Sequence, residues 1–281
     1  MISAENIGEV LKFRLARSIL GRGLYYTAAY WVDGLMIDTG CFYTVSELVS
    51  ALQELKVERI VNTHSHEDHI GANAALTKSF GAEILAHPLA IPVLAMPRDQ
   101  KHLNPYQVVM WGYPESSSAS PISETIETLR HSFSVIHTPG HSLDHISLYE
   151  PDEGWLFSGD TYIGGKDRAL RADYNIWQII ASLKQLSLLD INLIFTGSGN
   201  VRKNGSAALK EKITYLESMG EQTLELHSQG LSYRQIRQKL FGREMLIAYV
   251  TLGHFTGKQL VRSFIEDRPS TQQCTASCNG A

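Results

Sequence analysis

The chain has 281 residues, of which 43% are hydrophobic and 19% charged, and this balance is typical of a globular protein rather than a disordered or fibrous one. No apolar run reaches the ~18 residues of a membrane-spanning helix, and the first residues lack the basic-then-apolar order of a secretory signal. We therefore expect a cytoplasmic protein without a membrane partner. The net charge of −4 is unevenly spread: residues 201–268 carry 11 Lys and Arg against 7 Asp and Glu, or +4, which leaves −8 for the remainder.

The first half of the chain predicts strands, followed by alternating strands and helices. Two apolar, aromatic runs within residues 24–37 are separated by Asp33 and Gly34, which indicates a β-hairpin, and the second run stops at Asp38. Residues 44–55 then have helical apolar spacing, 57–64 form a short buried strand, 71–81 form a helix closed by glycine, and 82–87 form a strand.

Residues 88–121 interrupt this alternation with many prolines and three large aromatic residues, Tyr106, Trp111 and Tyr113. We interpret the segment as an insertion over the site whose aromatic residues line a substrate pocket, although an ordinary surface loop fits the pattern equally well. Strands resume over 131–142, 145–151, 154–160 and 191–200, and a helix over 175–186 lies between the last two.

Metal-ligand residue types follow several of these strands. The segment Thr63 to His69 reads THSHEDH, directly after a buried strand, while His141 follows a Pro-Gly turn and Asp160 follows another apolar strand. Such side chains are costly to bury unless something pairs with them, so their repetition at strand ends predicts convergence on one cation. Imidazole and carboxylate ligands suit Zn²⁺, with Fe or Mn as alternatives.

Taken in order, IDTG, THSHEDH, TPGHS and SGD resemble the metallo-β-lactamase superfamily over roughly residues 10–205. The resemblance implies an α/β protein with an αββα sandwich, in which residues 1–205 form the catalytic domain. It also implies that one ion is held by His64, His66 and His141, and that a second is served by Asp68, His69 and a bridging Asp160. Asp38 would support these ligands without coordinating an ion itself.

The last motif departs from the pattern. Where the family usually has Gly-His-Gly, this chain has TGSGN, so Ser198 stands at the position of a second-site histidine. A hydroxyl is a poorer ligand than imidazole, and we expect one firmly bound ion and a weakened second site. His254 is the candidate replacement ligand, although a solvated or capping role fits it better, and His145 is expected to be structural.

Residues 206–268 predict a small helical appendage, with helices over 206–230, 232–242 and 257–267. Its order resembles that of a branch containing thioesterase-like (glyoxalase II-like) hydrolases and single-strand ribonucleases. A basic cluster lies in the second helix and directly after it, but without interleaved aromatic residues it is weak evidence for RNA binding: Arg234, Arg237, Lys239 and Arg243. Residues 269–281, with Cys274 and Cys278, are expected to be a disordered, solvated tail.

These residues predict a hydrolase. A bound divalent cation lowers the pKa of water and yields hydroxide at neutral pH, so no nucleophilic side chain is needed, and Asp68 is the expected catalytic acid and base. The acidic catalytic half and the aromatic insertion favour a small ester-like substrate such as a thioester or lactone. The alternatives are RNA phosphodiester cleavage, a binding protein that lost catalysis through Ser198, and iron-dependent oxidation of a sulfur compound; a homodimer is also compatible with the sequence.

Overall fold

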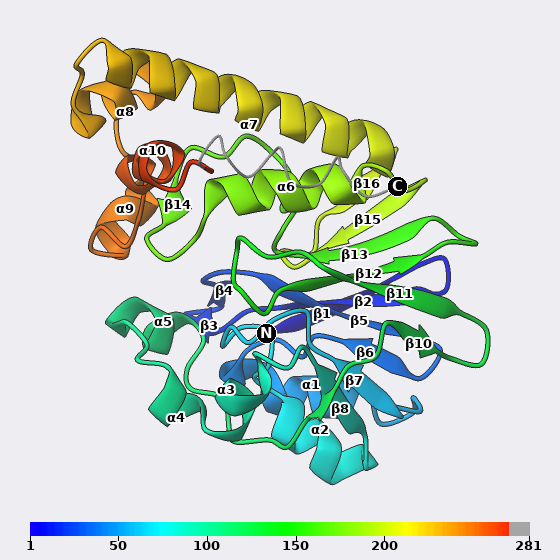
Figure 1. Ribbon diagram of the computed structural model, residues 1–281. Helices are drawn as coiled ribbons and strands as arrows, with labels where there is room; N and C mark the ends of the chain where they lie inside the picture. The colour runs from blue at the N-terminus through cyan, green and yellow to red at the C-terminus, as the bar shows by residue number, and fades with distance from the viewer. Residues whose placement is uncertain (270–281) are drawn as a thin grey trace.

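Two β-sheets lie face to face at the centre of the molecule, and helices cover the outer face of each (Figure 1). The computed structural model describes residues 1–269, so the predicted tail, with Cys274 and Cys278, lies outside the described part except for Pro269. Within that part, the helices are all too short or too polar to span a lipid bilayer.

The first sheet has seven strands in the order β1 (Ile2–Ile7), β2 (Val10–Leu15), β5 (Thr27–Val32), β6 (Leu35–Ile37), β7 (Arg59–Val61), β8 (Glu83–Ala86) and β9 (Ser120–Pro121). The predicted hairpin joins β5 to β6, and both turn residues, Asp33 and Gly34, have positive φ as the tightest hairpin turns require. From β6 to β9 the pairing is parallel, so the loops after these strands leave the same edge of the sheet.

The outer face of this sheet is covered by α1 (Val45–Ala51), which follows the 3-10 turn η1 (Phe42–Thr44), and by α2 (Asn73–Phe80). Leu48 and Leu76 on these helices, and Leu52 directly after α1, are buried in one apolar cluster with Met36 and Ile60 of the sheet. Both helices lie where the sequence predicted them, and α2 ends at Gly81 in the left-handed conformation.

The second sheet has six strands in the order β10 (Thr125–Glu127), β11 (Ser132–His137), β12 (Ile146–Glu150), β13 (Trp155–Gly159), β15 (Leu193–Thr196) and β16 (Val201–Lys203). The parallel strands β13 and β15 are connected through α6 (Ile176–Leu186) on the outer face. Large apolar side chains such as Phe133, Phe157 and Phe195 fill the space between the two sheets. Tyr30 of the first sheet donates a hydrogen bond of 2.6 Å to the Thr196 carbonyl of the second.

The outer layer on this side also contains the C-terminal helices α7 (Gly205–Ser228), α8 (Tyr233–Phe241), α9 (Leu246–Val250) and α10 (Gly257–Glu266). Leu216, Ile236 and Phe264 of these helices share one apolar cluster with Ile180 and Leu183 of α6. The predicted appendage therefore packs as the fourth layer of the sandwich, on a core that it shares with the catalytic region. The sequence did not predict α9, which spans only five residues.

Two segments reach over one end of the sandwich. The insertion forms three short helices, α3 (Ile91–Ala95), α4 (Pro97–Gln100) and α5 (Pro105–Met110), and the hairpin β3 (Ser18–Ile19) to β4 (Arg22–Gly23) lies beside them. From the opposite side, β17 (Phe255–Thr256) pairs with β14 (Leu170–Arg171). This pairing brings α9 and the turn after it to the same end as the insertion, so a cavity forms between them.

Candidate metal centre and substrate cavity

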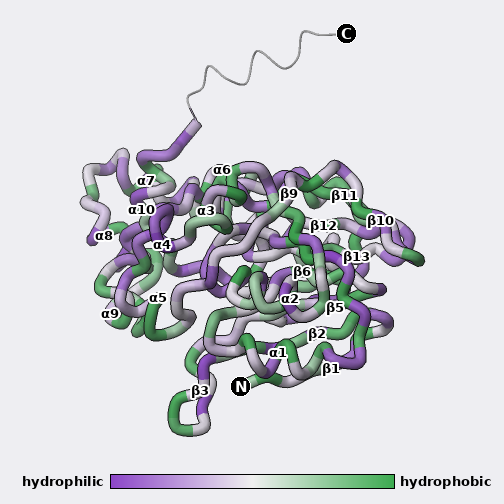
Figure 2. The backbone as a smooth tube through the Cα atoms, turned by 90° about the horizontal axis from the view of Figure 1, so that it is seen from below, coloured by the Kyte–Doolittle hydropathy of each residue, from purple (hydrophilic) through white to green (hydrophobic). Residues whose placement is uncertain are grey.

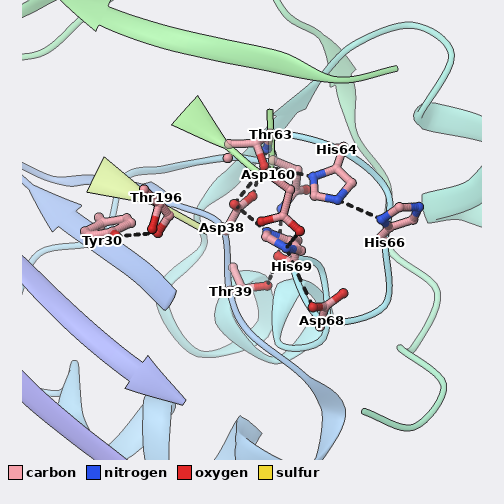
Figure 3. A network of polar contacts seen from close by, with 12 residues as sticks. Tyr30, Asp38, Thr39, Thr63, His64, His66, Asp68, His69, Asp160 and Thr196 are labelled. Atoms are coloured by element: carbon pink, nitrogen blue, oxygen red, sulfur yellow. Dashed lines mark hydrogen bonds and ion pairs between the residues drawn. The ribbon is translucent and has the colours of Figure 1, made fainter. Parts of the chain in front are cut away.

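The THSHEDH loop begins where β7 ends, and Asp38 holds it in place. Asp38 follows β6 with a positive φ of 58°, a conformation that aspartate adopts more readily than most residues. Its carboxylate accepts hydrogen bonds of 2.8 Å from the Thr63 amide, the Thr63 hydroxyl and Nδ1 of His69 (Figure 3). Gly71 closes the loop against the Cys41 backbone, where a Cβ would lie 2.3 Å from the Cys41 carbonyl carbon.

Three imidazole rings converge beside this loop. Nδ1 of His66 lies 2.9 Å from Nε2 of His64 and 2.9 Å from Nε2 of His141. The Thr63 hydroxyl donates to Asp38, so it accepts from Nδ1–H of His64, and Nε2 of His64 then carries a lone pair. Nδ1 of His66 either donates its single proton or accepts one, and Nε2 of His64 can only accept, so only one of the two short contacts can be a well-directed hydrogen bond. A cation relieves this conflict, and tetrahedral Zn²⁺ places nitrogen ligands at a comparable separation of about 3.3 Å.

The protonation of these rings favours metal binding. Burial lowers the pKa of His64 and His66 well below the usual range and that of His141 to about 4. Buried imidazoles are costly to charge, so all three rings present the neutral form that coordinates a cation.

A second group of candidate ligands lies beside the first. Nε2 of His69 is 3.6 Å from Oδ2 of Asp160 and 3.7 Å from Oδ2 of Asp68. The same Asp160 oxygen is 3.5 Å from Nε2 of His141, so Asp160 lies between the two groups, as a bridging role requires. Nδ1 of His69 contacts Asp38 at 2.8 Å, so its Nε2 faces the other two side chains of this group. Burial lowers the pKa of His69, but the charges of Asp38, Asp68 and Asp160 outweigh it and raise that pKa well above the usual value, so an ion at Nε2 must displace a proton. Burial raises the pKa of Asp68 to about 7.

His145 and Gly197 fix the position of Asp160. The Asp160 amide donates to Nε2 of His145 at 3.0 Å, and Nδ1 of His145 contacts the hydroxyls of Thr138 and Thr161. His145 is therefore structural, as predicted. A Cβ at Gly197 would lie 2.1 Å from the Asp160 carboxylate, so only glycine fits there.

Ser198 and His254 are each in contact with other polar side chains. The Ser198 hydroxyl contacts Oγ1 of Thr196 at 3.0 Å and accepts from Nδ2 of Asn200 at 3.1 Å. It lines a small cavity of about 90 Å³ together with Asp68 and Asp160. His254 belongs to neither group of converging ligand atoms among the described residues, and its Nδ1 contacts the Tyr106 hydroxyl at 2.9 Å. The structure thus gives His254 a place in the cavity rim and does not support it as the replacement ligand.

Two further residues brace the ligand loop, and no sequence pattern pointed to either. The Ser65 amide, between His64 and His66, donates to Asp144 at 2.9 Å, while Nζ of Lys101 donates to the Ser65 carbonyl at 2.9 Å. Lys101 belongs to the insertion, which therefore holds the ligand loop as well as covering it.

A cavity of about 310 Å³ opens directly onto the ligand groups. Tyr106 and Trp111 line it, as predicted, but Tyr113 does not: its hydroxyl accepts from the Leu103 amide and its ring lies under Arg98. The prediction for Tyr113 was wrong because an aromatic residue in a loop packs equally well against the loop itself. The lining contains aromatic, apolar and polar residues, most of them not predicted: Tyr25, His66, Asp68, Met110, Asp160, Arg171, Tyr174, Met245, Ile247, Thr251 and Phe255.

Comparisons with known proteins agree with this geometry. Residues 22–198 match the family model described as the metallo-beta-lactamase superfamily. A hydroxyacylglutathione hydrolase from Methylobacillus flagellatus is 29% identical over 201 residues, covering 70% of this chain and 71% of that protein. One from Thermosynechococcus vestitus is 34% identical over 151 residues, covering 53% of this chain and 52% of that protein.

Solved structures share the fold. A metallo-beta-lactamase family protein from Thermus thermophilus superposes with a TM-score of 0.65 at 18% identity, over 91% of this chain and 93% of that one. A metallo-beta-lactamase from Pontibacter korlensis gives a TM-score of 0.61 at 17% identity, over 77% and 99%. The chain therefore belongs to the metallo-beta-lactamase superfamily, and it is a metal-dependent hydrolase of that superfamily.

Proposed function

We propose that this protein hydrolyses small ester-like substrates, with thioesters as the favoured class and lactones as the second. The observation that carries the proposal is the opening of an aromatic, largely apolar cavity directly onto His66, Asp68 and Asp160. Its volume of about 310 Å³ lies at the lower end of the range of small-molecule sites. The relatives named hydroxyacylglutathione hydrolase support the same reaction class, since a hydroxyacylglutathione is a thioester.

The chain supplies proton transfer, orientation and exclusion of water. His64, His66 and His141 would hold a divalent cation, which when bound would act as a Lewis acid on the substrate carbonyl and lower the pKa of water. Asp68 lies in the cavity wall, where its carboxylate is placed to accept a proton from the attacking water and return it to the departing thiolate or alkoxide. Tyr25 and Tyr106 pack edge-on against Trp111 and keep bulk water from the acyl group.

The proposal includes one firmly held ion. Zinc is the favoured metal, and iron or manganese are the alternatives. Three neutral imidazoles at one point suit zinc. The second position has His69, Asp68 and Asp160 but lacks an imidazole at Ser198, whose hydroxyl already has two partners. We expect the second ion to bind more weakly for this reason.

The charges do not favour RNA. Arg171, the cationic residue in the cavity lining, forms a two-point ion pair with Asp173 at 2.9 and 2.7 Å, which leaves little charge for a phosphate. The basic residues of α8 do not line the cavity, and Arg237 among them pairs with Glu244.

The test is metal analysis of the purified protein, followed by assays with acyl thioesters, lactones and a single-stranded ribo-oligonucleotide. Hydrolysis of thioesters that is lost with a chelator and regained with zinc supports the proposal. Cleavage of RNA alone would overturn it, and so would oxygen consumption with oxidation of a sulfur substrate.

A further inference from the structure

An open groove of about 730 Å³ adjoins the catalytic cavity and is more than twice its size. Its walls come from three segments distant in sequence: the β3–β4 hairpin, α5, and the stretch from α9 to His254. Figure 2 shows α5 and α9 next to each other, with hydrophobic stretches in both and at the tip of the hairpin. Tyr106, Met110 and Thr251 line both spaces, so a ligand in the cavity reaches the groove by passing these side chains.

The groove is apolar, although it faces solvent. Its lining includes Ile19, Val109 and Leu252, which are 39%, 49% and 85% exposed, and it contains no Lys, Arg, Asp or Glu among the described residues. Leu246 and Tyr249 of α9 extend the exposed apolar surface beside it. Apolar surface concentrated around the mouth of a catalytic cavity marks a binding site more often than scattered exposed residues do.

The polar side chains in the lining already have partners. Nδ2 of Asn104 and the Tyr106 hydroxyl lie 3.3 and 2.9 Å from Nδ1 of His254, which accepts from both because an amide nitrogen can only donate. Oγ1 of Thr251 donates to the Ile247 carbonyl at 2.9 Å. A peptide in the groove would bring backbone donors and acceptors that find no unoccupied side chain there, whereas an aliphatic chain needs no polar partner.

We propose that the groove binds the aliphatic chain of the substrate, so that the preferred substrates are thioesters or lactones with a long, unbranched acyl chain. This inference rests on the proposed hydrolase function. The scissile carbonyl lies beside Asp68, and the chain passes Tyr106 and Met110 to lie between α5 and the turn after α9.

The first test is a series of acyl thioesters of one thiol, from acetyl to dodecanoyl. We expect kcat/KM to rise by about fourfold for each added methylene until the groove is filled, since burial of one CH₂ corresponds to about 0.8 kcal/mol. Val109→Asp and Val250→Asp place a charge on half-exposed groove positions and should flatten this dependence. Leu188→Asp, a matched control at an 86% exposed position outside the groove, should keep the slope. If kcat/KM of the wild type depends on chain length as weakly as that of the two groove variants, the inference is overturned.

The second test needs no turnover: calorimetric titration with dodecanoate. The groove proposal is supported if Val109→Asp weakens dodecanoate binding tenfold or more while Leu188→Asp leaves it intact. If this binding is seen but no ester is hydrolysed, only the proposed hydrolase function fails. If short thioesters are hydrolysed but dodecanoate does not bind, the groove proposal fails and the proposed hydrolase function stands. Two other results also overturn it: a concentration-dependent dimer dissolved by Val109→Asp, and binding to phosphatidylcholine vesicles without binding of dodecanoate.

Discussion

Asp144 and Ser65 are joined by a hydrogen bond in which the Ser65 amide donates to the Asp144 carboxylate at 2.9 Å. It ties the segment that carries His141 to the loop that carries His64 and His66. Lys101 holds the other side of the same residue through the Ser65 carbonyl. Both backbone polar groups between two candidate ligands are therefore fixed by side chains from elsewhere in the chain, and partners of this kind commonly tune metal affinity.

The charge of Asp144 should make stability depend on pH. Burial works against ionisation, but the hydrogen bond from the Ser65 amide and the charge of Lys101 favour it, and the pKa of Asp144 lies below its usual value. A carboxylate whose pKa is lower in the folded than in the unfolded state stabilises the fold at pH values above its unfolded-state pKa of about 3.9. This contribution to the free energy of unfolding is lost as the pH falls through the folded-state pKa.

We therefore expect Asp144→Asn to lower the free energy of unfolding of the metal-free protein by about 1 to 3 kcal/mol at pH 6.5. The difference from the wild type should shrink below about pH 4. Urea unfolding at a series of pH values measures it, and a difference of constant size down to pH 3 would contradict the role of the charge.

Lys101→Met should weaken metal binding while preserving the fold. The methionine keeps the apolar stem but cannot donate to the Ser65 carbonyl, so the peptide between the two ligands loses one restraint. Loss of such a partner typically costs tenfold to hundredfold in metal affinity. Competition with a chelator measures the change, and Lys78→Met at an exposed position of α2 is the matched control. Equal affinities in the two variants would show that the restraint is unnecessary.

The ligand cluster could be predicted from sequence because its physical reason is local. His64 and Asp160 come just after the buried strands β7 and β13, which have parallel neighbours, and His141 follows a Pro-Gly turn after β11. The hairpin at Asp33 and Gly34 and the helix ended by Gly81 were likewise set by neighbouring residues.

The cavity walls could not be predicted in this way. Arg171 and Tyr174 enter the site because β14 pairs with β17, a contact between segments more than 80 residues apart that no local pattern encodes. Lys101 and Asp144 act through the backbone of Ser65. Because every residue has a backbone carbonyl, and nearly every one an amide N–H, the sequence does not reveal which of these groups a distant side chain contacts. His254 illustrates the converse, because its residue type suggested a ligand while its position made it a neighbour of Tyr106.

Removal of His141 should abolish firm metal binding. Its Nε2 is one of three nitrogens at the same point, and the two remaining imidazoles bind a cation far more weakly than three. We expect His141→Ala to be purified with little metal and to lose hydrolysis in parallel. His227→Ala, at an exposed position of α7, serves as control. An active His141→Ala protein without bound metal would refute the metal-dependent mechanism.

Salt should have little effect on hydrolysis of a neutral ester-like substrate. The cavity lining has one cationic residue, and this residue is paired with Asp173. We expect kcat/KM for such a substrate to change by less than about threefold between 50 and 200 mM salt, whereas binding through several phosphate contacts falls by about 10³-fold or more. Steady-state kinetics and RNA-binding titrations at both concentrations measure the two dependences. A steep slope with RNA together with cleavage would reverse the ranking of substrates.

Ser198→His should strengthen the second metal position. Ser198 lines a small cavity with Asp68 and Asp160, so an imidazole at this position has open space next to the second group of ligands. Affinity for a second ion should rise tenfold to hundredfold, the usual size of a change in the ligand environment. Asn200→His, two residues along and exposed, controls for adding a histidine nearby, and His254→Ala should leave the stoichiometry unchanged because Nδ1 of His254 is bonded to Tyr106. Titration with zinc against a chromophoric chelator measures the number of ions and their affinities. If the wild type already binds two ions tightly and loses one in His254→Ala, His254 has moved into the site on metal binding. If Ser198→His behaves like Asn200→His, position 198 does not face the second ion.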